Sequence, residues 1–190
     1  MTARILGFAG STRTASLNRI VARAALDGAA EAGAEVTWLE LGDYPLPLYN
    51  GDLEANEGFP DNVIALKDLF DSHDGFVIGA PEYNSSITPL LKNTIDWVSR
   101  PIDGRPALHA FGGKVAGLVS ASGGALGGLR GLVHVRSILS NIGVLVVPNQ
   151  LAVGGAPGKI EDGKVTDEAT LKGLHAVGGR VAAVAGALKA

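Results

Sequence analysis

The sequence of 190 residues contains no cysteine, which excludes disulfide bonds, thiolate nucleophiles and cysteine-ligated metal sites. Its basic residues are scattered and its net charge is −3, so no Lys/Arg-rich patch indicates a nucleic-acid or membrane-surface partner. No uncharged run approaches the ~20 apolar residues of a membrane span, and the first residues do not resemble a signal peptide. We therefore predict a cytoplasmic protein with no nucleic-acid and no membrane partner.

Several catalytic motifs are also missing. The three Gly-Lys pairs, at 113–114, 158–159 and 163–164, lack the spacing of a Walker loop. Ala9 stands where the G-x-G-x-x-G fingerprint needs its second glycine after Gly7, and no G-x-S-x-G elbow occurs. Glu40 ends a predicted strand, where an acid could bind a ribose, but without that fingerprint a solvated side chain is the favoured interpretation. The histidines do not pair at helical spacing with other metal ligands, so no metal site is predicted.

Apolar residues make up 46% of the chain and charged residues 18%, which is typical of a folded globular domain. Strands are predicted at 3–9, 35–41, 75–80, 114–120 and 144–147. Helices are predicted at 18–32, 60–72, 89–99, 128–141 and 166–189. Strands that alternate with helices imply right-handed crossovers and a parallel sheet. The sequence therefore predicts one domain over residues 1–190, with an α/β fold of the flavodoxin-like type: a doubly wound five-stranded parallel sheet with helices on both faces.

In such a sheet, ligands bind beyond the carboxyl ends of the strands, near the switch in strand order. Three loops should meet there: GSTRTASLN (10–18), PEYNSS (81–86) and SASGGALGG (120–128).

The first loop carries several small donors and Arg13 directly before a helix, a setting that attracts anions. The plainer alternative is that Ser16 or Asn18 only caps that helix. Capping needs a single such residue, so we predict a phosphate site.

The second and third loops are less specific by themselves. Pro81, Tyr83 and Asn84 suit the face and edge of a planar heterocycle, although an ordinary turn with Thr88 as a helix cap fits as well. The glycines after Ser120 would let backbone approach a ligand closely, although a flexible connection is the alternative.

The long segment 42–59 carries exposed apolar residues around Pro45 and Pro47. It either reaches across to a second copy of the chain or packs on its own chain, and the sequence does not separate these two arrangements. Lys92 and Asp96 are spaced for an ion pair on one helix. Arg100 is a candidate for a contact with the ligand of a second subunit, and Arg130 for a contact with a phosphate group or with a neighbouring subunit.

Together the three loops resemble the motifs of the NADPH-dependent FMN reductase family, including its bacterial quinone- and chromate-reducing members. GSTRTASLN resembles the family's phosphate loop, PEYNSSITPLLKNTIDWVSRP its second segment and SASGGALGGLRG its glycine loop. The resemblance implies a flavodoxin-like homodimer or tetramer that binds FMN and is reduced by NADPH or NADH. It further implies hydride transfer through FMN to a quinone or similar small acceptor, with no catalytic side chain.

By the same resemblance, thirteen residues would hold the cofactor. The phosphate would be bound by Ser11, Arg13, Ser16, Leu17 and Asn18. The isoalloxazine ring would be lined by Pro81, Glu82, Tyr83 and Asn84. Its far edge would be closed by Ser122, Gly123, Gly124 and Gly127. Two alternatives remain: a flavodoxin-type electron carrier without a substrate of its own, and a protein in which FMN is idle or lost. Carriers of that kind are usually strongly acidic near the flavin, and a net charge of −3 does not favour one.

Overall fold

The structure is a computed structural model that describes residues 1–102 and 104–189. Its five-stranded sheet has the order β2-β1-β3-β4-β5, with neighbouring strands parallel. The strands are β1 (Arg4–Ala9), β2 (Glu35–Trp38), β3 (Gly75–Gly79), β4 (Val115–Ala121) and β5 (Leu145–Val153). This order is that of the flavodoxin-like doubly wound fold, so the predicted fold class is confirmed.

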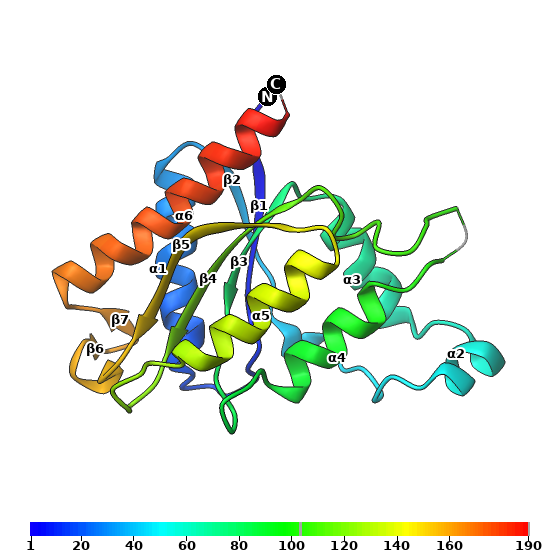
Figure 1. Cartoon of the computed structure of the whole chain (residues 1–190), viewed down its shortest axis with the longest axis horizontal. Helices are drawn as coiled ribbons and strands as arrows, with labels where there is room; N and C mark the ends of the chain where they lie inside the picture. The colour runs from blue at the N-terminus through cyan, green and yellow to red at the C-terminus, as the bar shows by residue number, and fades with distance from the viewer. Residues whose placement is uncertain (103, 190) are drawn as a thin grey trace.

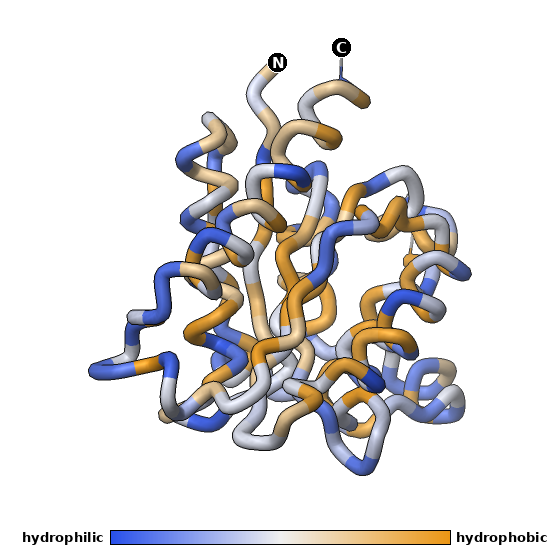
Figure 2. The backbone as a smooth tube through the Cα atoms, turned by 60° about the vertical axis from the view of Figure 1, so that its left-hand side comes forward, coloured by the Kyte–Doolittle hydropathy of each residue, from blue (hydrophilic) through white to orange (hydrophobic). Residues whose placement is uncertain are grey.

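Helices cover both faces of the sheet (Figure 1). One face carries α1 (Leu17–Glu31) and α6 (Glu168–Leu188), and the other carries α3 (Asp61–Asp71), α4 (Pro89–Val98) and α5 (Leu129–Asn141). Alternate residues of β1 supply both cores, because Ile5 packs toward α1 and α6 whereas Leu6 and Phe8 pack toward the other three helices. Figure 2 shows the hydrophobic segments gathered along the central strands, with hydrophilic segments at the periphery. Among the described residues, no helix combines the length and apolar character needed to cross a bilayer.

Two strand ends differ from the prediction. β2 stops at Trp38 instead of Leu41, because residues 41–43 turn into a short 3₁₀ helix. β5 runs on to Val153 instead of ending at residue 147. β5 continues through Pro148 because it is an edge strand, where a missing N–H is tolerated, and the register shifts opposite Ala116–Leu118. A second small sheet of β6 (Ile160–Glu161) and β7 (Lys164–Val165) follows it, in a segment for which no strand was predicted.

The segment 42–59 packs on α4 of its own chain, which is one of its two predicted arrangements. It contains a helix that periodicity missed, α2 (Gly51–Glu57), whose N-cap Asn50 accepts from the Asp52 N–H. Asn93 on α4 donates to the Pro47 carbonyl at 2.9 Å and accepts from the Tyr49 N–H at 2.8 Å. The Trp97 indole donates to the same carbonyl. Arg100 pairs with Glu54 of α2 at 2.8 Å, so its guanidinium is committed within the chain.

Candidate functional site

The loops after β1, β3 and β4 meet at the carboxyl edge of the sheet and enclose a first cavity of about 210 Å³. A second cavity of about 490 Å³ adjoins it and shares Glu82 and Ser122. Ten of the predicted residues line the first cavity: Ser11, Arg13, Ser16, Leu17, Asn18, Pro81, Glu82, Tyr83, Ser122 and Gly123. Two more, Asn84 and Gly124, line the second. Gly127 lines neither, because it lies against the β5 backbone, where a Cβ would come within 2.5 Å of the Val153 carbonyl carbon.

The first loop combines a helix cap with free donors. Ser16 is the N-cap of α1 and accepts from the Arg19 N–H, as the capping alternative predicted. Ser11 is buried at the cavity wall and accepts from the Arg13 N–H. The Arg13 side chain is exposed and makes no hydrogen bond or ion pair within residues 1–102 and 104–189. The loop therefore offers an uncommitted guanidinium beside the N-terminus of a helix of 15 residues.

Asn18 has a contact that sequence motifs did not suggest. Its side-chain amide donates to the Ala121 carbonyl and accepts from the Ala121 N–H, both at 2.9 Å. β3 ends at Gly79, which pairs with Val119, so Ala121 extends two residues beyond its neighbouring strand. The Asn18 amide takes the place of the missing strand and fastens the start of α1 to the end of β4.

Arg19 is a further residue of this loop that motif comparison missed. Its guanidinium pairs with Glu40 at 2.5 Å and donates to the Arg13 carbonyl at 3.3 Å. The interpretation of Glu40 as a solvated side chain was wrong, because that carboxylate is half-buried in this pair. The pairing follows from the adjacency of β1 and β2, which no local spacing in the sequence encodes.

The second loop forms a tight turn beside both cavities. Tyr83 and Ser86 exchange both backbone hydrogen bonds at 3.0 Å, and Asn84 and Ser85 take positive φ angles of 50° and 68°. The Tyr83 side chain is 51% exposed, which leaves its ring accessible at the cavity rim. Thr88 is the N-cap of α4, as the turn alternative predicted, and its hydroxyl also donates to the Gly10 carbonyl.

The Glu82 carboxylate of this loop is bound to α5. It accepts from the Gly131 N–H at 3.0 Å and from the Arg130 Nε at 3.0 Å. The Gly131 N–H, together with Arg130, holds the pKa of the Glu82 carboxyl below its ordinary value. Arg130 is therefore neutralised by Glu82, and Arg13 is the one cavity-lining charge with no partner in the described part of the chain.

The glycine loop keeps the cavity walls clear. A Cβ on Gly123 would meet nothing closer than 4.0 Å, and one on Gly124 nothing closer than 3.7 Å. Neither residue has a positive φ, so neither backbone conformation nor protein packing requires glycine at these positions. The absence of side chains leaves open space beside Ser122, as a flat ligand approaching the backbone requires. The donor set and this open wall fit a phosphate-bearing planar cofactor.

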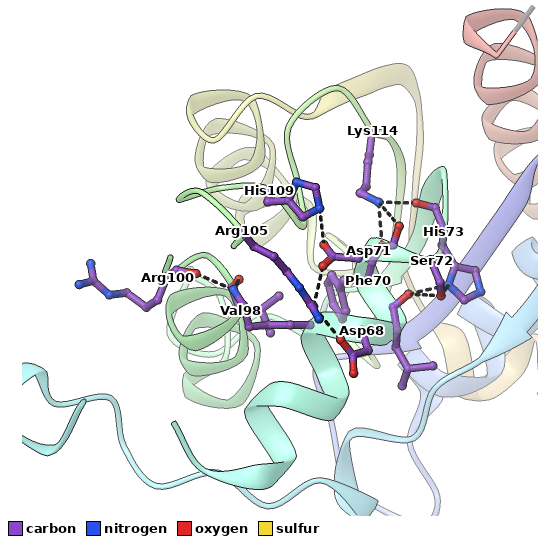
Figure 3. Close-up of polar contacts among 12 residues, drawn as sticks. Asp68, Phe70, Asp71, Ser72, His73, Val98, Arg100, Arg105, His109 and Lys114 are labelled. Atoms are coloured by element: carbon purple, nitrogen blue, oxygen red, sulfur yellow. Dashed lines mark hydrogen bonds and ion pairs between the residues drawn. The ribbon is translucent and has the colours of Figure 1, made fainter. Parts of the chain in front are cut away.

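Charged residues also gather at the opposite, amino edge of the sheet (Figure 3). Arg105 bridges Asp68 and Asp71 at 2.6 and 2.9 Å, and the half-buried Lys114 donates to three carbonyls at the end of α3. Burial lowers the pKa of Lys114. A cavity of about 300 Å³ lies there, and no predicted site residue lines it. On α4, the predicted pair of Lys92 and Asp96 is confirmed at 2.7 Å.

Comparison with known proteins identifies the family and supports the fold. The family model described as NADPH-dependent FMN reductase matches residues 3–158. A quinone reductase of Escherichia coli K12 is 37% identical over 179 residues, which cover 90% of this chain and 89% of that protein. An NAD(P)H:quinone oxidoreductase of Solanum tuberosum is 36% identical, with 92% and 88% covered.

Two solved structures share the fold of this chain. FerB, a flavoenzyme NAD(P)H:(acceptor) oxidoreductase from Paracoccus denitrificans, superposes with a TM-score of 0.77 at 31% identity, covering 99% of this chain and 98% of that one. A flavodoxin from the domain Archaea superposes with a TM-score of 0.63 at 9% identity, covering 96% and 99%, and supports the fold alone.

Proposed function

The chain belongs to the NADPH-dependent FMN reductase family, and on this premise we propose that it is an NAD(P)H-dependent oxidoreductase that binds FMN and reduces quinones or similar small acceptors. The observation that carries the proposal is the convergence of ten motif residues from three separate loops on one cavity. The fold alone would not support it, since flavodoxin-like sheets host many activities.

The phosphate end of FMN is assigned to the first loop. Arg13 supplies the uncommitted charge, and Ser11 and Ser16 supply hydroxyls at the wall, whereas the Asn18 amide is bound to the Ala121 backbone. The one acidic residue of this cavity, Glu82, is bound to Arg130 and does not oppose an anion. We assign the ring to the space between Pro81–Asn84 and the loop Ser122–Gly124.

Bound FMN supplies the hydride chemistry of such a site, so the chain's task is to bind, orient and shield. We accordingly assign no catalytic side chain. The half-exposed Tyr83 and Leu126, each 51% exposed, give the rim of the two cavities an apolar character that suits flat acceptors. We also propose a cytoplasmic homodimer or tetramer, on the strength of the motif resemblance.

The phosphate assignment is tested by the affinity for FMN. Replacing Arg13 and Ser16 together by alanine removes a charge-assisted donor and a hydroxyl, and we expect about a 100-fold rise in Kd. Arg13→Ala alone leaves the α1 cap in place and separates binding from helix stability. Arg180→Ala, an exposed arginine on α6, is the matched control. Unchanged FMN affinity in the double variant would contradict the assignment.

The enzymatic assignment is tested by rapid mixing of the FMN-loaded protein with NADPH and, separately, with NADH. Bleaching of the flavin on a catalytic timescale is expected with at least one of the two. A flavin that stays oxidised with both would favour an electron carrier. Steady-state rates with quinones, azo dyes, nitro compounds and free flavin then rank the acceptors.

A further inference from the structure

Glu82 stands between the two loops that are proposed to enclose the flavin ring. It follows Pro81 at the exit of β3, and its side chain is only 10% exposed. Its carboxylate accepts from the Gly131 N–H through one oxygen and from the Arg130 guanidinium through the other. Both donors belong to α5, which directly follows the glycine loop. The Glu82 side chain thus belongs to the loop after β3, which forms one wall of the ring site, and is bound to α5, which follows the glycine loop that forms the other wall.

The turn that follows Glu82 is not stabilised by its own residue types. Two-residue hairpin turns with both central φ angles positive favour Asn-Gly, and this turn has Asn84-Ser85. Serine adopts a positive φ at a steric cost, which surrounding contacts must offset. The turn therefore depends on what holds it from outside.

Two further residues of α5, His134 and Gly131, lie against the turn 83–86. His134 Nδ1 lies 2.9 Å from the Ser86 hydroxyl. Gly131 gives the turn room, because a Cβ there would lie 3.3 Å from both the Glu82 Cβ and the Ser86 carbonyl oxygen. The Gly131 N–H bond to the Glu82 carboxylate is the most buried of these contacts, and bonds to a charged group are the stronger ones.

We propose that Glu82 is a positioning residue, whose carboxylate locks the turn 83–86 onto α5 and so sets the distance between the two walls of the ring site. Its side chain acts through α5 and does not contact the flavin. The proposal rests on the proposed function only in taking the turn as a ring wall. The lock itself is a property of the protein without cofactor.

The lock is tested in the apoprotein by amide hydrogen exchange. In Glu82→Ala, we expect the Tyr83 and Ser86 N–H groups, which close the turn, to exchange at least tenfold faster. Asp71→Ala is the matched control, because it breaks a similarly buried carboxylate–arginine pair at the opposite edge of the sheet (Figure 3). We expect Asp71→Ala to leave exchange in the turn unchanged. Unchanged exchange in Glu82→Ala would overturn the proposal.

The route through α5 is tested by a double-variant cycle on FMN affinity. We expect Kd to rise about tenfold in Glu82→Ala and less in Arg130→Ala, where the Gly131 bond remains. The variant that lacks both side chains should match Glu82→Ala, since the two side chains act as one unit. Additive effects would mean that the two side chains act independently of each other and would overturn the proposed route through α5.

A spectroscopic readout separates positioning from general destabilisation. We expect Glu82→Ala to shift the midpoint potential and the visible circular dichroism of bound flavin, and Glu82→Gln to restore most of the FMN affinity by keeping a Gly131 acceptor. A lower unfolding midpoint with unaltered flavin spectra and potential would overturn the positioning role. Failure of the proposed function is recognised separately, by FMN affinity that survives the loss of Arg13 and Ser16.

Discussion

Replacing Asn18 by alanine should destabilise the apoprotein, although the motif resemblance presents this residue as a phosphate ligand. The side chain is buried and makes two hydrogen bonds of 2.9 Å to the Ala121 backbone. Alanine leaves a buried N–H and a buried carbonyl without partners. At about 1–3 kcal/mol for each stranded group, the free energy of unfolding should fall by roughly 2–6 kcal/mol.

The assay is urea unfolding of the apoprotein, followed by circular dichroism. With a slope of about 2 kcal/mol/M, this loss corresponds to a fall of roughly 1–3 M in the midpoint. The slope should stay constant, because the chain still folds to the same compact state. Asn141→Ala, at the exposed end of α5, is the control and should stay within about 0.5 kcal/mol of the parent.

A second substitution tests the same two hydrogen bonds between Asn18 and Ala121. Asn18→Asp keeps an acceptor for the Ala121 N–H but sets a carboxylate oxygen against the Ala121 carbonyl, so near neutral pH it should destabilise at least as much as alanine. A loss below about 0.5 kcal/mol in Asn18→Ala would refute the argument. The amide would then be free for the ligand, and the end of β4 would be held by other contacts.

Three further predictions follow from the cavity wall, the charge pair and the α2 segment. Gly124→Val places a side chain in the open space beside Ser122 and should weaken FMN binding by tenfold or more at unchanged stability. Gly158→Ala also adds atoms in open space and, as the control, should leave FMN binding unchanged. Because the pKa of the Glu82 carboxyl is depressed, its contribution to stability is fully present above the ordinary pKa of 4.5 and is lost as pH falls through the lower pKa of the folded protein. When stability is followed in an acid titration, Glu82→Gln should not show that loss. A pH profile identical to that of the parent protein would contradict the prediction. Asn93→Ala removes two hydrogen bonds to the segment 42–59 and should speed proteolysis of that segment about tenfold. Lys92→Ala is the control and should leave the rate of proteolysis unchanged.

The order of the elements could be predicted because it is encoded in local patterns. Apolar runs such as 75–80 mark strands that are covered on both faces, and helical spacing marks the segments between them. Element ends were less predictable, because tertiary context decides them. Pro148 would stop a central strand, yet β5 continues through it at the sheet edge, and α2 exists because its segment is bound to α4 by Asn93 and Trp97.

The sequence by itself determined which loops carry the site, since parallel strands bring their carboxyl ends to one edge and the three motifs follow strands. It also indicated the residue types that are proposed to face a phosphate. Only the tertiary structure decided how those residues divide their work. It separated the uncommitted Arg13 from Asn18 and Glu82, whose polar groups are bound to Ala121 and α5, and it placed Gly127 against β5. The partners of Asn18 and Glu82 lie 48 to 103 residues away along the chain. Contacts of that separation depend on how the sheet and helices pack, and no local spacing specifies them.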